Sequence, residues 1–200
     1  MPELEDLHKR QLCTPAEVKA LVSRREVIEY RLAARAPVRD DFLAALQLEM
    51  NFAALLKVRR KRMGLPKHGA ADFAVRKRVH FVFDRALRRF KGDEQLWLQW
   101  ADYSEKTNAR ERIGRLFVKA LAFLPGSSAL WIRAAAWELQ SRHNLGGARR
   151  LLQRALRLNV ADPELWHAYF RARLEVALQP HALLGFPLLS LLFQSACALA

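Results

Sequence analysis

Phe83-Asp84-Arg85-Ala86-Leu87 is the first of three related segments in this 200-residue chain; Phe117-Val118-Lys119-Ala120-Leu121 and Leu152-Gln153-Arg154-Ala155-Leu156 are the others. Each segment is followed, after eight further residues, by a Leu-Trp pair that ends in Trp97, Trp131 or Trp166. The copies are offset by 34 and then 35 residues, which is the period of helix-turn-helix repeats. The sequence therefore predicts an all-α fold, a solenoid of stacked helical hairpins.

The repeated residue types suit the core of such an array. A small Ala lets two helices approach closely, while Leu and Trp fill the remaining volume. A role for the Trp residues as stacking platforms for RNA bases is the alternative, but packing explains their fixed period and ligand binding does not. The predicted repeat core is Ala86, Leu87, Trp97, Ala120, Leu121, Trp131, Trp137, Ala155, Leu156 and Trp166.

Helix signals also precede the repeats. Thr14-Pro15-Ala16-Glu17 is typical of a capping box with Pro at the first helical position, and Pro37 should end that helix. Asp40 or Asp41 should cap the next helix, and Asp72 the one after it. We expect a helical N-terminal region with a basic segment over residues 1–71, a repeat array over 72–177 and an apolar tail over 178–200.

Positive charge is concentrated in one part of the chain. Of a net charge of +14, residues 57–91 contribute 13 Lys or Arg against 2 Asp or Glu, whereas residues 1–50 hold 8 against 9. A solvated helix face is the plain explanation, but so lopsided a stretch favours contact with RNA or an acidic partner. Residues 57–62, which we expect to close an exposed helix end, also fit a nuclear-localisation cluster. The candidate binding residues are Lys57, Arg59, Arg60, Lys61, Arg62, Lys67, Arg76, Lys77 and Arg78.

Signals for catalysis are absent from the sequence. It contains no P-loop, nucleophile elbow or dinucleotide fingerprint, and its six histidines show neither metal-ligand spacing nor a paired nucleophile. Cys13 and Cys197 lie near opposite ends, which argues against a disulfide framework and favours a reducing compartment. We expect no enzymatic activity, no cofactor and no metal.

The last residues differ in character from the rest. No Asp, Glu, Lys or Arg occurs from Leu178 to Ala200. The last nineteen of these residues, 182–200, could span a membrane, but Pro187 interrupts the helix and no basic cluster lies close by. We therefore favour packing over the last repeat, or disorder, and we keep a membrane-tethered adaptor as an alternative.

The repeats resemble half-a-tetratricopeptide (HAT) repeats. The resemblance covers residues 93–177 and depends on the aromatic pairs of the first helices, such as Trp131 with Trp137, and on the Arg/Lys-Ala-Leu pattern of the second helices. HAT repeats occur in RNA-processing assemblies, where the resemblance implies a role in binding and scaffolding.

Segments outside the repeats narrow the resemblance to one family. Residues 2 to about 176 resemble the N-terminal region of the U3 small nucleolar RNA-associated protein 6 family, a component of the small-subunit processome. The matching segments are Pro2-Glu3-Leu4-Glu5, Ala16-Glu17-Val18-Lys19-Ala20, Glu29-Tyr30-Arg31-Leu32, Asp41-Phe42, Arg59 to Gly64, Val79 to Ala86, Gln95 to Leu98 and Ala129 to Ile132. Family members are longer, and this chain departs from them after about residue 177.

The resemblance implies a non-catalytic scaffold in nucleolar pre-ribosomal RNA processing and small-subunit biogenesis. Its implied partners are processome proteins and the U3 small nucleolar ribonucleoprotein, with RNA contact through the basic segment and localisation in the nucleus and nucleolus. The alternative is an RNA-binding HAT protein of another complex, for example in splicing or 3′-end formation.

Overall fold

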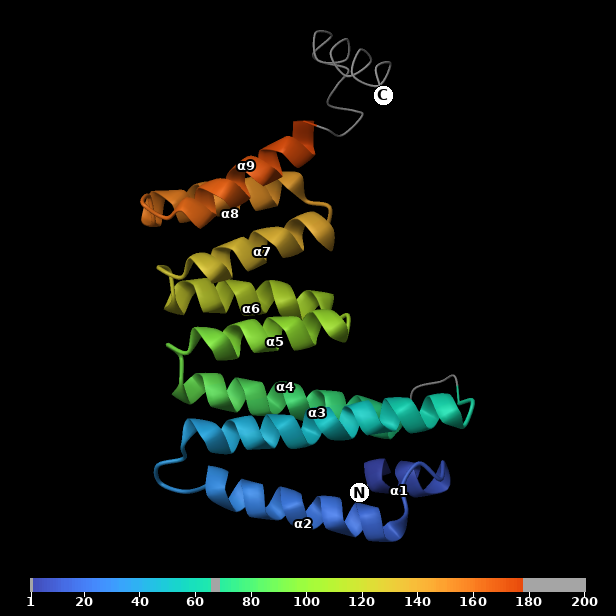
Figure 1. Ribbon diagram of the computed structural model, residues 1–200. Helices are drawn as coiled ribbons and strands as arrows, with labels where there is room; N and C mark the ends of the chain where they lie inside the picture. The colour runs from blue at the N-terminus through green and yellow to red at the C-terminus, as the bar shows by residue number, and fades with distance from the viewer. Residues whose placement is uncertain (1, 66–68, 178–200) are drawn as a thin grey trace. The chain divides into compact units, whose positions relative to one another are not determined.

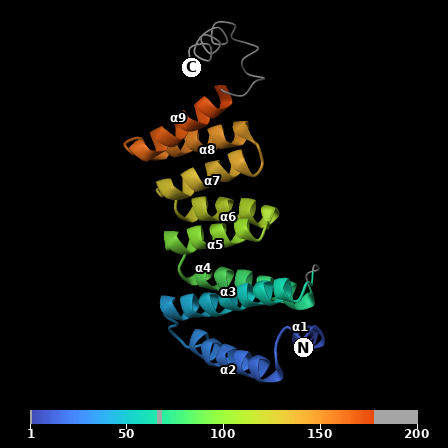
Figure 2. The same ribbon diagram turned by 45° about the vertical axis from the view of Figure 1, so that its right-hand side comes forward.

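The computed structural model describes residues 2–65 and 69–177, and all regular elements within them are α-helices (Figure 1). Successive helices from α2 to α4 in the first unit, and from α6 to α9 in the second, lie side by side and antiparallel (Figure 2). The prediction of an all-α helical-repeat fold is confirmed. The helices are α1 (Pro2–Lys9), α2 (Pro15–Leu32), α3 (Arg39–Arg62), α4 (Ala70–Arg89), α5 (Glu94–Lys106), α6 (Arg110–Phe123), α7 (Ser128–Gln140), α8 (Leu145–Leu158) and α9 (Pro163–Ala177).

The chain forms two compact units, Met1–Trp100 and Ala101–Ala200, so their boundary lies inside α5. The boundary predicted between residues 71 and 72 instead falls inside the first unit, because α4 packs against both α1 and α3. The predicted tail, residues 178–200, lies outside the described residues. The expectation that it packs over the last repeat or is disordered therefore concerns residues outside the described ranges. Across the described ranges, no helix combines the length and the apolar character needed to cross a membrane.

The core of the first unit is centred on α4. Val79, Phe83 and Ala86 are completely buried along one side of this helix. The Phe83 ring stacks on Trp100 of α5, with centroids 5.9 Å apart and planes 10° from parallel. The Trp100 indole N–H donates a hydrogen bond of 2.9 Å to Nδ1 of His80, so this buried polar pair is satisfied.

The helix starts follow the predicted chemistry, with shifts in position. Thr14 caps α2 as predicted, accepting from the Glu17 N–H at 3.3 Å while the Glu17 carboxylate accepts from the Thr14 N–H at 2.9 Å. Asp41 and Asp72 are not the caps that we predicted. Each is the third residue of its helix, and its carboxylate accepts from the backbone N–H three residues earlier, at 3.3 and 2.9 Å respectively. The α2 helix ends at Leu32, before Pro37.

A hydrogen bond within each repeat explains why Trp recurs. The indole N–H of each repeated Trp donates to the backbone carbonyl six residues earlier, which lies in the turn before the helix. A Phe at this position could not make this bond, because its ring carries no N–H. The distances are 3.0 Å from Trp97 to Lys91, 2.9 Å from Trp131 to Pro125 and 3.0 Å from Trp166 to Val160.

The repeated alanines are equally regular. Ala86, Ala120 and Ala155 are each 0% exposed, and each carbonyl accepts the N–H that ends its helix four residues later, at 2.8, 2.8 and 2.9 Å. We expect a larger side chain at these buried positions to displace neighbouring atoms. Leu87, Trp97, Trp131 and Trp137 are also buried, and Leu121 and Leu156 are partly buried.

Trp166 is the exception, and its prediction as a core residue is wrong. Its side chain is 40% exposed, and it forms an apolar stripe on α9 with Phe170 and Leu174, which are also exposed. In the preceding repeats, Trp97 and Trp131 are covered by neighbouring helices. Within residues 2–65 and 69–177, no helix follows α9 to cover this stripe.

The second unit has its core among α7, α8 and α9, which contact one another in all three pairs. Trp131 and Ala135 of α7 pack with Leu152 of α8 and Leu165 of α9 in one buried cluster. Contact between α7 and α9, the first helices of successive hairpins, is the arrangement that stacked repeats require.

Candidate functional site

The predicted basic residues divide into two groups in the structure. Arg59, Arg60, Arg76 and Arg78 are at least partly buried and contact other side chains or the backbone, whereas Lys57, Lys61, Arg62 and Lys77 are exposed. Lys67 lies outside the described residues. The stretch is therefore not a uniform binding face.

Arg59 joins the end of α3 to the start of α2. Its guanidinium donates two hydrogen bonds to the Glu17 carboxylate, at 2.7 and 2.6 Å, and a third to the Leu12 carbonyl at 2.8 Å. The expectation that residues 57–62 close an exposed helix end is therefore wrong for this residue. Arg59 of α3 thus contacts both α2 and the turn that precedes it, and stabilises their packing.

Arg60 and Arg76 are both anchored at the start of α4. Arg60 pairs with Asp72 at 2.8 Å, and both side chains are nearly buried, at 12% and 11% exposed. Arg76 donates from Nε to the Asp72 carbonyl at 3.3 Å, and its guanidinium lies 4.7 Å from the ring centroid of Phe73. These two arginines, like Arg59, stabilise the fold.

A buried carboxylate organises a further ion-pair network. Glu49 of α3 is 2% exposed and accepts two hydrogen bonds from Arg25 of α2, at 2.8 and 2.6 Å, and one from Arg78 of α4, at 2.8 Å. Glu29 accepts from Arg78 at 3.2 Å and from Arg85 at 2.7 Å. This network ties α2, α3 and α4 together.

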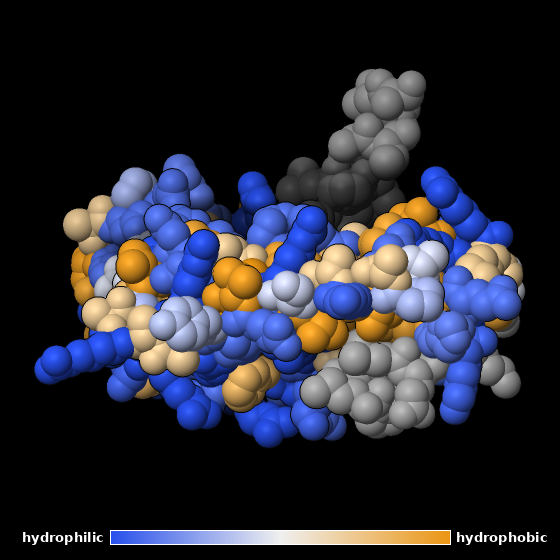
Figure 3. Space-filling view, turned by 90° about the horizontal axis from the view of Figure 1, so that it is seen from below, coloured by the Kyte–Doolittle hydropathy of each residue, from blue (hydrophilic) through white to orange (hydrophobic). Residues whose placement is uncertain are grey.

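The exposed group is the part of the basic stretch that is open to solvent. Lys57 and Lys61 lie four residues apart on α3, and so share one side of the helix, with Arg62 next to them. None of these three forms an ion pair with a described residue. The first unit, seen in Figure 3 from the side of α1 and α2, presents mainly hydrophilic side chains with apolar ones scattered among them.

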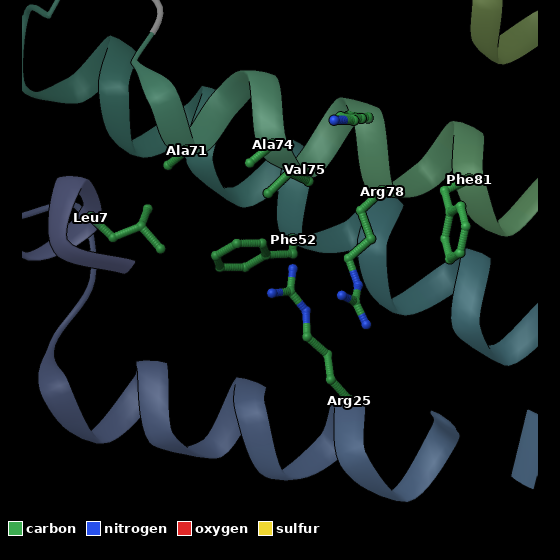
Figure 4. A pocket seen from close by; sticks show the side chains of 9 residues that line it. Leu7, Arg25, Phe52, Ala71, Ala74, Val75, Arg78 and Phe81 are labelled. Carbon is green, nitrogen blue, oxygen red and sulfur yellow. The ribbon is translucent and has the colours of Figure 1, made fainter. Parts of the chain in front are cut away.

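A cavity of about 380 Å³ lies in the first unit between α1, α2, α3 and α4 (Figure 4). The Arg25 and Arg78 guanidinium groups extend into this space, with the Phe52 ring beside them and Leu7 and Phe81 at opposite sides. Its lining residues are Leu7, Arg25, Phe52, Ala71, Ala74, Val75, Lys77, Arg78 and Phe81. Arg25 and Arg78 already bind Glu49, whereas Lys77 forms no ion pair with a described residue, so the lining keeps positive charge beside its apolar side chains. Such a lining can hold a ligand that is both anionic and apolar.

The Glu17–Arg59 pair predicts a dependence of stability on pH. Hydrogen bonds from Arg59 and from the Thr14 backbone N–H hold the pKa of Glu17 at about 2, below its usual 4.5. Because the folded state binds the proton less readily than the unfolded state, the pair stabilises the protein above about pH 4.5, and this stabilisation is lost as the pH falls towards 2. We expect the difference in unfolding free energy between wild type and Glu17→Gln to shrink over that range.

Arg59→Gln provides the control for this prediction. In the Arg59→Gln background, Glu17→Gln should produce a much smaller difference that varies less with pH. Urea unfolding at a series of pH values measures both differences. A wild-type difference that stays constant between pH 5 and 2 would contradict the role of the pair.

The residues that complete the pocket and its network were not predicted. Arg25 lies on α2, and Glu49 and Phe52 lie on the part of α3 that precedes residue 57, so their separation in sequence hides their contact. One signal was present for Glu49, because it continues the buried side of α3 set by Phe42, Ala45 and Leu46. A carboxylate in such a position requires a buried partner.

No group of three or more His, Cys, Asp or Glu side chains within the described ranges could hold a metal ion. Cys13 is buried, and burial raises the pKa of its thiol, so the thiolate form is disfavoured.

Comparison with known proteins relates most of the chain to one group. Residues 1–79 match the family model described as U3 small nucleolar RNA-associated protein 6. The chain is 38% identical over 175 residues to the protein of that name from Schizosaccharomyces pombe, and 36% identical over 175 residues to its Homo sapiens homolog. A Dictyostelium discoideum homolog is 30% identical over 170 residues.

These alignments cover most of this chain but a minority of each relative. The first two span 87% of the chain, yet 36% of the Schizosaccharomyces pombe protein and 29% of the human one. The chain thus spans about a third of the length of the curated relatives it matches. Because the aligned region includes the N-terminal helices as well as the repeats, the likeness is not confined to a common repeat type. The family-model match and these alignments together relate this chain to the U3 small nucleolar RNA-associated protein 6 family.

Proposed function

We propose that this protein is a non-catalytic scaffold of the small-subunit processome. It binds components of the U3 small nucleolar ribonucleoprotein and acts in nucleolar pre-ribosomal RNA processing and small-subunit biogenesis. The observation that carries the proposal is the 175-residue alignment with proteins named for their association with U3 small nucleolar RNA. The helical repeats are in keeping with it, because arrays of this kind present extended surfaces to partners.

Affinity purification of the tagged 200-residue chain from nuclear extract tests this proposal. The expected result is enrichment of U3 small nucleolar RNA over spliceosomal small nuclear RNAs, and nucleolar accumulation of the tagged chain. Retention of processome proteins after nuclease treatment is expected for a scaffold. Enrichment of spliceosomal RNAs instead, or no ribonucleoprotein at all, would overturn the proposal.

Direct RNA binding is a second candidate function, favoured by the exposed cations Lys57, Lys61 and Arg62. Replacing all three by Ala should weaken binding to a labelled oligouridine and lower the slope of log affinity against log salt by about 2, at about 0.7 per phosphate contact on a single strand. The ion-paired residues Arg59 and Arg60 remain intact in this variant, so the fold is preserved. Fluorescence anisotropy across a salt series measures the slope.

A matched triple variant serves as the control. Lys106, Arg110 and Arg112 are exposed and form no ion pair with a described residue, so replacing them by Ala removes the same charge elsewhere. Equal weakening by both triple variants would show that net charge alone attracts the RNA, and would remove the α3 cluster as a specific site.

A further inference from the structure

The pocket in the first unit exists because the helices around it cover one another incompletely. The α1 helix has eight residues and packs on α4, where Leu7 joins Ala71 and Val75 in a buried cluster. The α2 helix packs on α3. Between these two contacts a space of about 380 Å³ remains open (Figure 4).

Two guanidinium groups are held in place beside this space. Arg25 uses Nε and Nη2 to bind Glu49, and Arg78 uses Nε and Nη2 to bind Glu49 and Glu29. Nη1 of each arginine donates no hydrogen bond to a described residue. Since the buried Glu49 carboxylate orients both groups in advance, a ligand that binds to the free donors incurs little ordering cost.

The rest of the lining is apolar or positively charged. Phe52 lies beside Arg25, whose guanidinium carbon is 5.8 Å from the ring centroid. Phe81, at the edge of the pocket, is 55% exposed, and Lys77 on the same helix is also exposed. No Asp or Glu is among the lining residues. The pocket thus favours a ligand that has a negative group next to an apolar one.

An acidic peptide fits this lining better than RNA does. A nucleobase in the pocket would bring polar edges against the side chains of Leu7, Ala71 and Val75, where they would find no hydrogen-bond partner and would be costly to bury. A carboxylate matches the fork of a guanidinium, and an aliphatic or aromatic side chain beside it matches the apolar lining.

We propose that this pocket binds an acidic peptide segment of a partner protein. An Asp or Glu carboxylate of the segment binds Arg25 and Arg78, and a neighbouring apolar side chain packs against Phe52 and Phe81. The proposal deepens the scaffold function proposed above and depends on it for the existence of a partner.

The test uses the full chain and fluorescein-labelled nine-residue peptides with a central Leu, Phe or Trp flanked on both sides by Asp and Glu. We expect Ala74→Glu, which adds a carboxylate to the lining, to weaken binding at least about tenfold, because like charges are brought together. Ala44→Glu is the matched control, since it makes the same change at an exposed site of α3 outside the pocket. It should change the affinity less than about twofold.

A second pair of variants tests the apolar part of the site. Phe81→Ser should weaken peptide binding, whereas Phe73→Ser, at another exposed phenylalanine of α4 that does not line the pocket, should not. Circular dichroism shows whether each variant is folded. Replacing the central apolar residue of the peptide by Ser, or its acidic residues by Asn and Gln, should abolish binding.

Three results would overturn the proposal. The first is failure of all these peptides to bind the wild-type chain. The second is an equal loss of peptide affinity in Ala74→Glu and Ala44→Glu. The third is that Ala74→Glu weakens the binding of oligouridine but leaves the binding of the peptides unchanged. The last result would assign the pocket to RNA. If the wild-type chain binds no peptide but still enriches U3 small nucleolar RNA in the affinity purification, only this inference fails. If the purified wild-type chain carries none of that RNA, the proposed scaffold function fails.

Discussion

Replacing Trp131 by Ala should lower the free energy of unfolding by about 3–5 kcal/mol, the usual cost of removing a large buried aromatic side chain. Trp131 is 3% exposed and packs with residues of α8 and α9. The substitution leaves a cavity at the centre of the second unit and leaves the Pro125 carbonyl without its indole donor. Urea unfolding followed by circular dichroism measures the change.

Trp166→Ala is the control for this prediction. Trp166 occupies the equivalent repeat position and donates the same hydrogen bond, to Val160, but its side chain is 40% exposed. Because less apolar surface is removed from a buried site, the loss should be less than half of that for Trp131. Equal losses in the two variants would contradict the assignment of Trp131 as a repeat core residue.

Replacing Glu49 by Ala should destabilise the first unit by about 3–5 kcal/mol, because removing one partner of a buried ion pair leaves the remaining charge uncompensated. The Glu49 side chain is 3% exposed, and that of Arg25 only 12% exposed. Both Arg25 and Arg78 lose an acceptor in this variant. Urea unfolding measures the loss, and Glu49→Gln, which keeps the volume and one acceptor, should fall between wild type and Glu49→Ala.

An exposed ion pair provides the matched control. Asp84 pairs with Arg88 at 2.6 Å on the outside of α4, where the Arg88 side chain is 78% exposed. Asp84→Ala should therefore cost less than about 1 kcal/mol. If Glu49→Ala and Asp84→Ala destabilise the protein equally, the buried network does not hold the first unit together.

The repeat architecture could be predicted from sequence because its determinants are local. The repeated Trp binds a carbonyl six residues earlier, and the repeated Ala carbonyl accepts an N–H four residues later. The capping box joins Thr14 and Glu17, which are three positions apart in the chain. Interactions of such short range leave a fixed spacing in the chain, which can be read without knowing the fold.

The candidate site depended on contacts between residues far apart in sequence. Arg59 and Lys61 both belong to one basic run, yet Arg59 binds Glu17, which lies 42 residues away, and Lys61 is exposed. The composition of such a run gives its net charge. It does not show which of its cations form an ion pair with a carboxylate on another helix. The pocket was likewise invisible in the sequence, because it requires Arg25 of α2, Phe52 of α3 and Arg78 of α4 to meet.

The helical repeat, the residue types at its core and the concentration of positive charge therefore follow from the amino-acid sequence. Which of those residues are buried depends on how the helices pack. Trp131 and Trp166 share the same local sequence pattern and the same indole hydrogen bond, but one is covered by neighbouring helices and the other is 40% exposed. The physical reason is that spacing along the chain sets the direction of a side chain on its helix, whereas burial and ion pairing depend on the surfaces that other helices bring against it.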